Sequence, residues 1–251
     1  MTIKTEDLHP QRGEGYSTFH NFYKEICENS DLTVNENVIK FQSDLPRHEQ
    51  NHIESFSYFS TEKFEKNIEY NALDLSILSI NVRGIDCNFD NVIMYINSIK
   101  YSFDIIALTE CHLQLNESHN VDLHNYQPIQ GYDKFYTRSR IKYGGVIMYV
   151  KSNLKAVYAQ ELTGAFKTYD SVYVRINLAT SSKRPLHVGA YYRHCRAPDI
   201  VPFIDKFSRD INHKALRRSD VIIAGDFNIC LMKSTTNNDS LYFLNTILYC
   251  L

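Results

Sequence analysis

The sequence predicts an α/β fold in which two mixed β-sheets pack face to face with helices outside them, a four-layer α/β sandwich. From Leu73 onward, short apolar stretches typical of strands alternate with segments of helical periodicity. Several neighbouring stretches are separated by only a turn, which is typical of antiparallel pairs. A purely parallel sheet needs a longer crossover between strands, so this spacing disfavours a doubly wound fold.

The composition is that of a soluble globular protein. Hydrophobic residues make up 43% of the 251 residues and charged residues 22%, which excludes wholesale disorder. This length suits one large domain, or one domain plus an arm. The formal net charge of -2 gives no overall attraction to nucleic acid, so any such binding must come from a local basic patch.

Cysteine usage and the lack of a leader bear on the compartment. The six cysteines are scattered without a Cys-x-x-Cys pair, which predicts free thiols and no zinc site. The N-terminus has no apolar core of the length that a signal sequence needs. No stretch reaches the roughly 20 apolar residues of a membrane span. We expect a nuclear or cytoplasmic protein that is not secreted and has no membrane partner.

Residues 1–72 differ in amino-acid composition from the rest of the chain. They are rich in Glu, Asn, Lys, Ser and His, and their apolar islands are short. This segment is predicted to be an N-terminal arm or linker of unknown function, and residues 73–251 to be the folded domain.

The domain begins with a strand at Leu73–Ile80, which delivers Asn81 at its end. A helix follows, for which Asn88 is the predicted cap. Its apolar residues fall on one face at spacings of three and four: Val92, Ile93, Ile96 and Ile99.

Four further strands precede the next helix. Phe103–Thr109 reads as a buried strand that delivers Glu110, and Tyr143–Val150 as a strand that begins with two glycines. Ser171–Leu178 alternates in the half-exposed manner of an antiparallel strand, and Pro185–Tyr192 follows it.

The last part of the chain combines a helix, a strand and a helix. Ala197–Lys214 is predicted to be helical, with Pro198 in its first turn. The uninterrupted apolar run Val221–Ala224 favours a strand buried on both faces. Asn238–Tyr249 is predicted to form an amphipathic helix. The predicted inward positions of the Ala197–Lys214 helix are Ile200, Ile204, Phe207 and Ile211.

Polar side chains follow several predicted strands. Asn81, Glu110 and the pair Asp226 and Asn228 stand at strand ends, and Tyr192–Arg193 ends a fourth. Such residues from one sandwich converge on one edge. Their oxygen-only chemistry suits Mg²⁺ or Mn²⁺ rather than zinc and indicates phosphoester hydrolysis. The alternative is an ordinary turn in which Asp226 only caps the next segment.

The motifs SILSINVRG, IIALTE, GGVIMYV, AYYR and VIIAGDFN, in this order, resemble the endonuclease/exonuclease/phosphatase superfamily. Over about residues 57–251 they are most similar to the apurinic-type endonuclease domain of non-LTR (LINE, jockey-like) retrotransposon polyproteins. The resemblance implies a Mg²⁺- or Mn²⁺-dependent endonuclease that nicks double-stranded DNA. The 3′ hydroxyl it exposes would prime the reverse transcriptase of the parent polyprotein, which these residues do not include.

The resemblance also implies roles for individual residues. Glu110 would bind the metal, and Asn81 would sit in the metal's shell and hold that carboxylate. Asp226 would orient or deprotonate the attacking water, and Asn228 would hydrogen-bond the water or the phosphate. Tyr192 matches the tyrosine that contacts the phosphate in a Tyr-Arg-Pro-Pro segment, although this chain has no prolines there.

Basic residues near these motifs have two interpretations. Arg138, Arg140 and Lys142 precede the glycine pair, and Arg193 follows Tyr192. They are either solvated loop residues or, in a nuclease, contacts to DNA phosphates that orient the duplex.

The resemblance implies a C-terminal segment that is missing here. The family continues to a Thr-Arg segment and a final Ser-Asp-His, so we expect a domain that lacks its last strands and has impaired activity. His112 and His194 stand near the site in sequence, but neither has the context of that histidine. Two alternatives stay open: a phosphoinositide- or sphingolipid-type phosphoesterase of the same fold, and a catalytically inactive remnant.

Overall fold

The computed structural model describes residues 2–3, 64, 75–114, 128–177, 184–195, 200–229 and 238–250, the last four without their side chains. The chain divides into two compact units, Thr5–Ala72 and a larger one formed by Met1–Lys4 with Leu73–Leu251. Only the larger unit is described below. The predicted arm over residues 1–72 lies outside the described residues except at positions 2–3 and 64.

The first sheet is mixed. Its parallel part consists of β1 (Thr2–Ile3), β2 (Ile77–Asn81) and β3 (Ile105–Thr109). The antiparallel part follows, with β5 (Val146–Lys151) beside β3 and β4 (Tyr132–Thr137) at the edge. The strand order is therefore β1-β2-β3-β5-β4.

The second sheet is also mixed. β10 (Asp220–Asp226) runs parallel to β9 (Leu186–Arg193), and β8 (Tyr169–Ile176) runs antiparallel to β9. Two short strands, β6 (Val157–Tyr158) and β7 (Gly164–Ala165), pair with β8.

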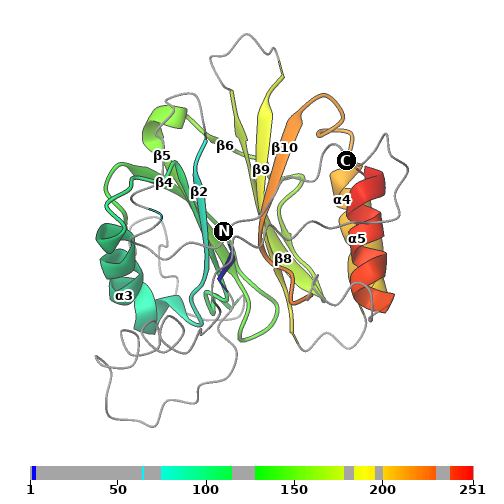
Figure 1. The fold of residues 1–251 in the computed structure, drawn as a ribbon, viewed down its shortest axis with the longest axis horizontal. Coiled ribbons are helices and arrows are strands. Elements are labelled where there is room, and N and C mark those ends of the chain that lie inside the picture. Colours follow the sequence, from blue (N-terminus) through cyan, green and yellow to red (C-terminus); the bar gives the residue numbers. More distant parts are fainter. Residues whose placement is uncertain are drawn as a thin grey trace, which may run out of the picture. The chain divides into compact units, whose positions relative to one another are not determined.

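Helices lie outside both sheets. α3 (Ile85–Ser98) covers the first sheet, and α4 (Val201–Ile211) and α5 (Asn238–Cys250) cover the second (Figure 1). A short 3₁₀ turn, η2 (Ser152–Leu154), follows β5. The predicted fold class, two mixed sheets flanked by helices, is confirmed. Among the described residues, no helix has both the length and the apolar character of a membrane span.

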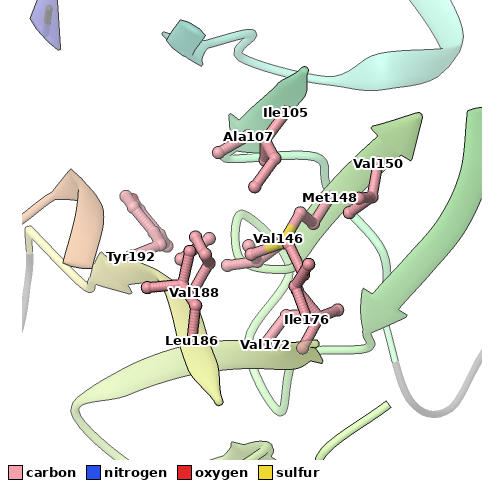
Figure 2. Close-up of a cluster of buried hydrophobic side chains, with 12 residues drawn as sticks. Ile105, Ala107, Val146, Met148, Val150, Val172, Ile176, Leu186, Val188 and Tyr192 are labelled. Carbon is pink, nitrogen blue, oxygen red and sulfur yellow. The ribbon is translucent and has the colours of Figure 1, made fainter. Parts of the chain in front are cut away.

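The core between the sheets follows from the two-residue period of strands. Alternate residues of β9, such as Leu186 and Val188, point toward the first sheet, where they meet β3 and β5 (Figure 2). Burial of such side chains contributes about 25 cal/mol per Å² of apolar surface. The cluster consists of Ile105, Ala107, Val146, Met148, Val150, Val172, Val174, Ile176, Leu186, Val188, Ala190 and Tyr192.

The other face of the second sheet packs aromatic residues against α4 and α5. Tyr169, Tyr173 and Tyr191 alternate with the core positions of β8 and β9 and are fully buried. The hydroxyls of Tyr173 and Tyr191 lie 3.1 Å apart, so each phenol has a polar partner. The helices contribute Phe203, Phe207 and Phe243.

The first helix begins one turn earlier than predicted. α3 starts at Ile85, directly after Gly84, whose φ of 103° lets the chain turn sharply. Asn88 is therefore inside the helix and is not its cap. Its Nδ2 donates to the carbonyl oxygens of Val82 at 3.0 Å and Gly84 at 3.1 Å, and so ties the helix to the end of β2.

Two predictions of strand burial were wrong. β10 is not buried on both faces, because it is the outermost strand of its sheet among the described elements and Ile222 is 37% exposed. β8 is antiparallel as predicted but is buried along nearly its whole length. It lies between the first sheet and the helices, so both of its faces are covered over most of its length and only Arg175 is exposed.

The two C-terminal helices were predicted with different success. α5 begins at Asn238 as expected. α4 begins at Val201 with Pro202 in its first turn, and Pro198 lies outside the described residues. Ile204 and Phe207 are buried as predicted.

Candidate active site at the strand ends

The first sheet places two of the predicted residues side by side. β2 and β3 are parallel and in register, with Asn81 opposite Thr109, so Asn81 and Glu110 leave the same edge. The backbone around Glu110 is held on both sides: its carbonyl accepts from Gly84 N at 2.7 Å, and Cys111 N donates to Gly145 O at 3.1 Å. Glu110 has a φ of 52°, a conformation that non-glycine residues adopt at a cost of about 1 kcal/mol.

The second sheet supplies the other residues from a matching edge. Asp226 ends β10 directly opposite Tyr192 on β9, and both side chains are buried, at 5% and 1% exposure. Gly225 must be a glycine here, because a Cβ would lie 2.0 Å from Tyr191 O and its φ is 133°. The turn after β10 is closed by Asn228 N, which donates to Asp226 Oδ1 at 2.9 Å.

Two side-chain hydrogen bonds join the sheets at this edge. Asn81 Nδ2 donates to Asp226 Oδ2 at 2.9 Å, and the hydroxyl of Tyr192 donates to Glu110 Oε1 at 2.8 Å. The structure therefore brings these four predicted residues together. The fifth, Asn228, lies beside them, and its Nδ2 donates to Arg193 O at 2.6 Å.

The electrostatics keep Tyr192 a hydrogen-bond donor. Its burial, and next the neighbouring Glu110 carboxylate, raise the pKa of the phenol well above its ordinary value of 10. The group is thus neutral at physiological pH. Arg193 supplies positive charge near Asp226; burial lowers the pKa of its guanidinium below its ordinary value, while Asp226 opposes that shift.

The donor set fits a hydrated hard cation. Glu110 is partly exposed, and its side chain accepts a hydrogen bond from Tyr192 through Oε1. Among the described residues, none donates to its other oxygen, Oε2, which can therefore bind an ion. Asn81 presents an amide oxygen, which Arg83 N approaches at 3.2 Å. Mg²⁺ keeps several waters and takes one or two carboxylates. Within the described ranges no group of three or more His, Cys, Asp or Glu residues is arranged to hold a metal ion, so protein carboxylates and imidazoles alone form no cage here.

The predicted DNA contacts fall into two groups. Arg140 and Lys142 are exposed, and Arg138 is partly exposed with its Nη1 3.3 Å from Gln114 O. Arg193 is only 8% exposed. Its guanidinium donates to the carbonyl oxygens of Phe227 at 2.7 Å and Asn228 at 2.8 Å, so it holds the loop that carries Asn228.

The two histidines near the site occupy different environments. His112 is partly exposed and packs edge-on against Tyr143, with ring centroids 5.2 Å apart. Burial lowers the pKa of its imidazole below the ordinary 6.5. His194 is 2% exposed, and its Nε2 lies 2.9 Å from Asp170 Oδ2.

Asp170, which is fully buried opposite Tyr192, was not among the residues predicted for the site. The sequence does carry a signal for it, namely a carboxylate at the start of an otherwise apolar strand. A carboxylate in that position is rarely buried without a partner, so it indicates a buried polar contact.

Solved structures of other proteins have a similar fold. The AP endonuclease LMAP from Leishmania major has a TM-score of 0.51 at 12% identity, over 76% of this chain and 74% of that one. The endonuclease domain of TRAS1, a telomere-specific non-LTR retrotransposon, has a TM-score of 0.50 at 13% identity, over 70% and 72%. At these identities the likeness shows the fold alone.

Sequence comparison shows the family. No curated protein matches the chain. A sequence model of the Endonuclease/Exonuclease/phosphatase family matches residues 78–245, which is more than half of the 251 residues and includes the whole candidate site. The chain therefore belongs to the endonuclease/exonuclease/phosphatase family.

Proposed function

We propose that this chain carries a divalent-metal-dependent DNA endonuclease site of the non-LTR retrotransposon type. The observation that carries the proposal is the pair of inter-sheet hydrogen bonds, Asn81 to Asp226 and Tyr192 to Glu110. They gather two carboxylates, an amide and a phenol at one edge of the sandwich. The motif resemblance and the fold likeness to the TRAS1 domain support the retrotransposon assignment.

A metal ion would be held by Glu110 with the amide oxygen of Asn81. Bound there, Mg²⁺ or Mn²⁺ supplies charge that stabilises the phosphoryl oxygens and the leaving oxygen. Tyr192 keeps the Glu110 carboxylate in place through its hydroxyl. Asn81 would then link the ion to Asp226, because its Nδ2 donates to Asp226 Oδ2 while its oxygen, which accepts from Arg83 N, keeps a further lone pair.

Asp226 is suited to orient the attacking water. Each of its oxygens accepts one hydrogen bond, from Asn228 N and from Asn81 Nδ2, and each keeps a further lone pair. The carboxylate is thereby fixed in orientation without being fully used, as a general base requires. Asn228 spends one N–H on Arg193 O and retains a second for the water or the phosphate.

The substrate we propose is double-stranded DNA. The loop that bears Arg138, Arg140 and Lys142 is joined by its backbone to the segment after Glu110: Ser139 N donates to Leu113 O at 2.6 Å. Positive charge therefore lies next to the site, where it can position a phosphate backbone. Cleavage would leave a 3′ hydroxyl, the primer for a reverse transcriptase.

Nicking of a supercoiled plasmid, with Mg²⁺ and with EDTA, tests this proposal. The variants are Glu110→Gln and Asp226→Asn, and Glu161→Gln is the matched control, because Glu161 is an exposed glutamate outside the site. We expect Mg²⁺-dependent nicking that falls at least about 100-fold in both site variants and is unchanged in the control. Extension of the nick by a polymerase would verify the 3′ hydroxyl. Folded protein that does not nick, or that nicks without Glu110, would overturn the proposal.

A further inference from the structure

Asp170 and His194 form a buried pair that the proposed mechanism does not use. Asp170 is 0% exposed and His194 2% exposed. His194 Nε2 lies 2.9 Å from Asp170 Oδ2, and Gly145 N donates to the same oxygen at 2.9 Å. One carboxylate oxygen on β8 thus binds groups from two other segments, the residue that follows β9 and the turn before β5.

The hydrogen-bond partners of the His194 ring favour a pair without net charge. His194 Nδ1 faces Lys167 O at 3.1 Å and Nε2 faces the carboxylate, so both nitrogens meet oxygen acceptors. The ring satisfies both only as an imidazolium beside an ionised Asp170, or as a neutral ring that accepts the proton of Asp170. Either arrangement has no net charge. Removal of one partner would leave a buried charge or an unpaired polar group.

The pair contacts the segments on both sides of the Tyr192–Glu110 hydrogen bond. On the second sheet, Asp170 is opposite Tyr192 in register, and the ring of His194 packs 5.6 Å from that of Tyr192, centroid to centroid. On the first sheet, Gly145, which binds Asp170 through its N–H, accepts from Cys111 N at 3.1 Å. Cys111 directly follows Glu110. A continuous chain of contacts therefore links Tyr192 to Glu110: it passes through Asp170, then Gly145, then Cys111.

The surroundings of Asp170 are shaped for this contact. A Cβ on Gly144 would lie 2.4 Å from Asp170 Oδ2 and 2.1 Å from Ser139 Oγ, so only glycine allows the approach. Asp170 Oδ1 is buried with no hydrogen-bond partner among the described residues. Such an atom reduces stability. A buried ion pair is in any case weak support for a fold, so stability alone does not account for the arrangement.

We propose that Asp170 and His194 are positioning residues that set the contact between Tyr192 and Glu110 across the two sheets. Neither touches the reacting atoms. The catalytic consequence rests on the proposed function, but the positional claim does not, because it concerns a contact within the chain.

The test is the NMR signal of Tyr192 in protein labelled with ¹³C at the tyrosine ζ carbon. Tyr192→Phe assigns the signal, and Glu110→Gln gives its position when the carboxylate partner is lost. In Asp170→Asn, one amide cannot replace the carboxylate. An amide oxygen at the Oδ2 position can neither neutralise an imidazolium nor donate a proton to a neutral ring, and an amide nitrogen there meets the Gly145 N–H. We expect the Tyr192 signal to move toward its Glu110→Gln position.

Asp210→Asn is the matched control. Like Asp170, Asp210 is a buried aspartate, but it accepts a hydrogen bond from Tyr169 on the helix-facing side of the sheet. The Asp210→Asn change should leave the Tyr192 signal unchanged. If Asp170→Asn fails to fold, the double variant Asp170→Asn/His194→Gln decides, because it buries no charge. A wild-type Tyr192 signal in whichever of these two variants folds would overturn the proposal.

Nicking kinetics supply the functional readout. Asp170→Asn should lower kcat about tenfold, less than the roughly 100-fold expected of a 1 Å displacement, with KM within about twofold. In a Tyr192→Phe background the same change should have no further effect, because the pair acts through Tyr192. An additive loss would overturn the proposal. Wild-type protein without nicking would refute the proposed function and leave the NMR outcome decisive for the pair.

Discussion

Two buried tyrosines of the second sheet each donate to a carboxylate, and their surroundings differ. Tyr169 donates to Asp210 on the helix-facing side, where Lys206 also contacts Asp210 and phenylalanines close the space. Tyr192 donates to Glu110 at the strand ends, where Glu110 is partly exposed and Asn81 and Asp226 lie nearby. The same bond lies within a core in one place and, in the proposed function, holds a metal-binding carboxylate in the other, so the neighbours of a pair determine its role.

The largest effect on stability is expected for the Tyr169–Asp210 pair in the core. Asp210→Ala leaves the buried Tyr169 hydroxyl without its acceptor and Lys206 without its partner. We expect the free energy of unfolding to fall by about 3 kcal/mol, measured by urea denaturation. Glu110→Gln should change it by less than about 1 kcal/mol, since glutamine can still accept from Tyr192. Equal losses in the two variants would contradict the distinction.

Gly225→Ala tests the strand end that carries Asp226. Its Cβ would lie 2.0 Å from Tyr191 O, at a φ of 133°, so the strand must shift. We expect a loss of about 2 kcal/mol in unfolding free energy and weaker nicking. Gly131→Ala is a control with a φ of 82° but nothing within 4 Å of the added Cβ, so it reports the backbone cost alone. Similar results for the two would show that close packing at Gly225 is unimportant.

Alkaline pH should destabilise both sides of the comparison. Burial raises the pKa of Tyr169 and of Tyr192 above 10, so each phenol keeps its proton in the folded state at a pH where the unfolded chain loses it. Stability is therefore retained below pH 10. Above it, stability falls by up to about 1.4 kcal/mol per pH unit for each such tyrosine. Tyr169→Phe and Tyr192→Phe should each reduce this slope, which urea titrations between pH 9 and 11 would measure. A slope unchanged in either variant would contradict the raised pKa.

The smallest effect concerns the basic loop. Arg140→Ala/Lys142→Ala should reduce the slope of log affinity for DNA against log salt by up to about 1.8 and leave unfolding unchanged. Arg217→Ala/Arg218→Ala removes the same number of exposed cations after α4, outside the site. Fluorescence anisotropy at several salt concentrations gives both slopes. Equal slopes in the two double variants would show that the loop has no special role.

The sequence was sufficient to predict the fold class and the residues at the strand ends. Strand ends are predictable because an apolar run that stops at Asn81, Glu110 or Asp226 marks both the strand and its edge. The burial of each strand was not predictable in this way, because it depends on which elements pack against the strand in the folded chain. Thus β8 was predicted half-exposed and is enclosed, whereas β10 is an outer strand with Ile222 exposed.

The partners of the site residues were also beyond the sequence. Glu110 and Tyr192 are 82 positions apart, and no local pattern relates them. Asn88 was misread as a cap because asparagine favours helix starts, whereas here its amide ties α3 to the end of β2. Asp170 was passed over because its partners, Gly145 and His194, meet it only in the folded chain.

The most direct test of the account is Mn²⁺ binding followed by electron paramagnetic resonance, which reports the free ion. The account predicts that the folded wild-type chain binds Mn²⁺, that Glu110→Gln loses this binding, and that Asp210→Asn keeps it. The two variants change carboxylates that each accept a tyrosine hydroxyl, so the contrast isolates the strand-end site. Binding that survives in Glu110→Gln, or that is lost in Asp210→Asn, would contradict the account.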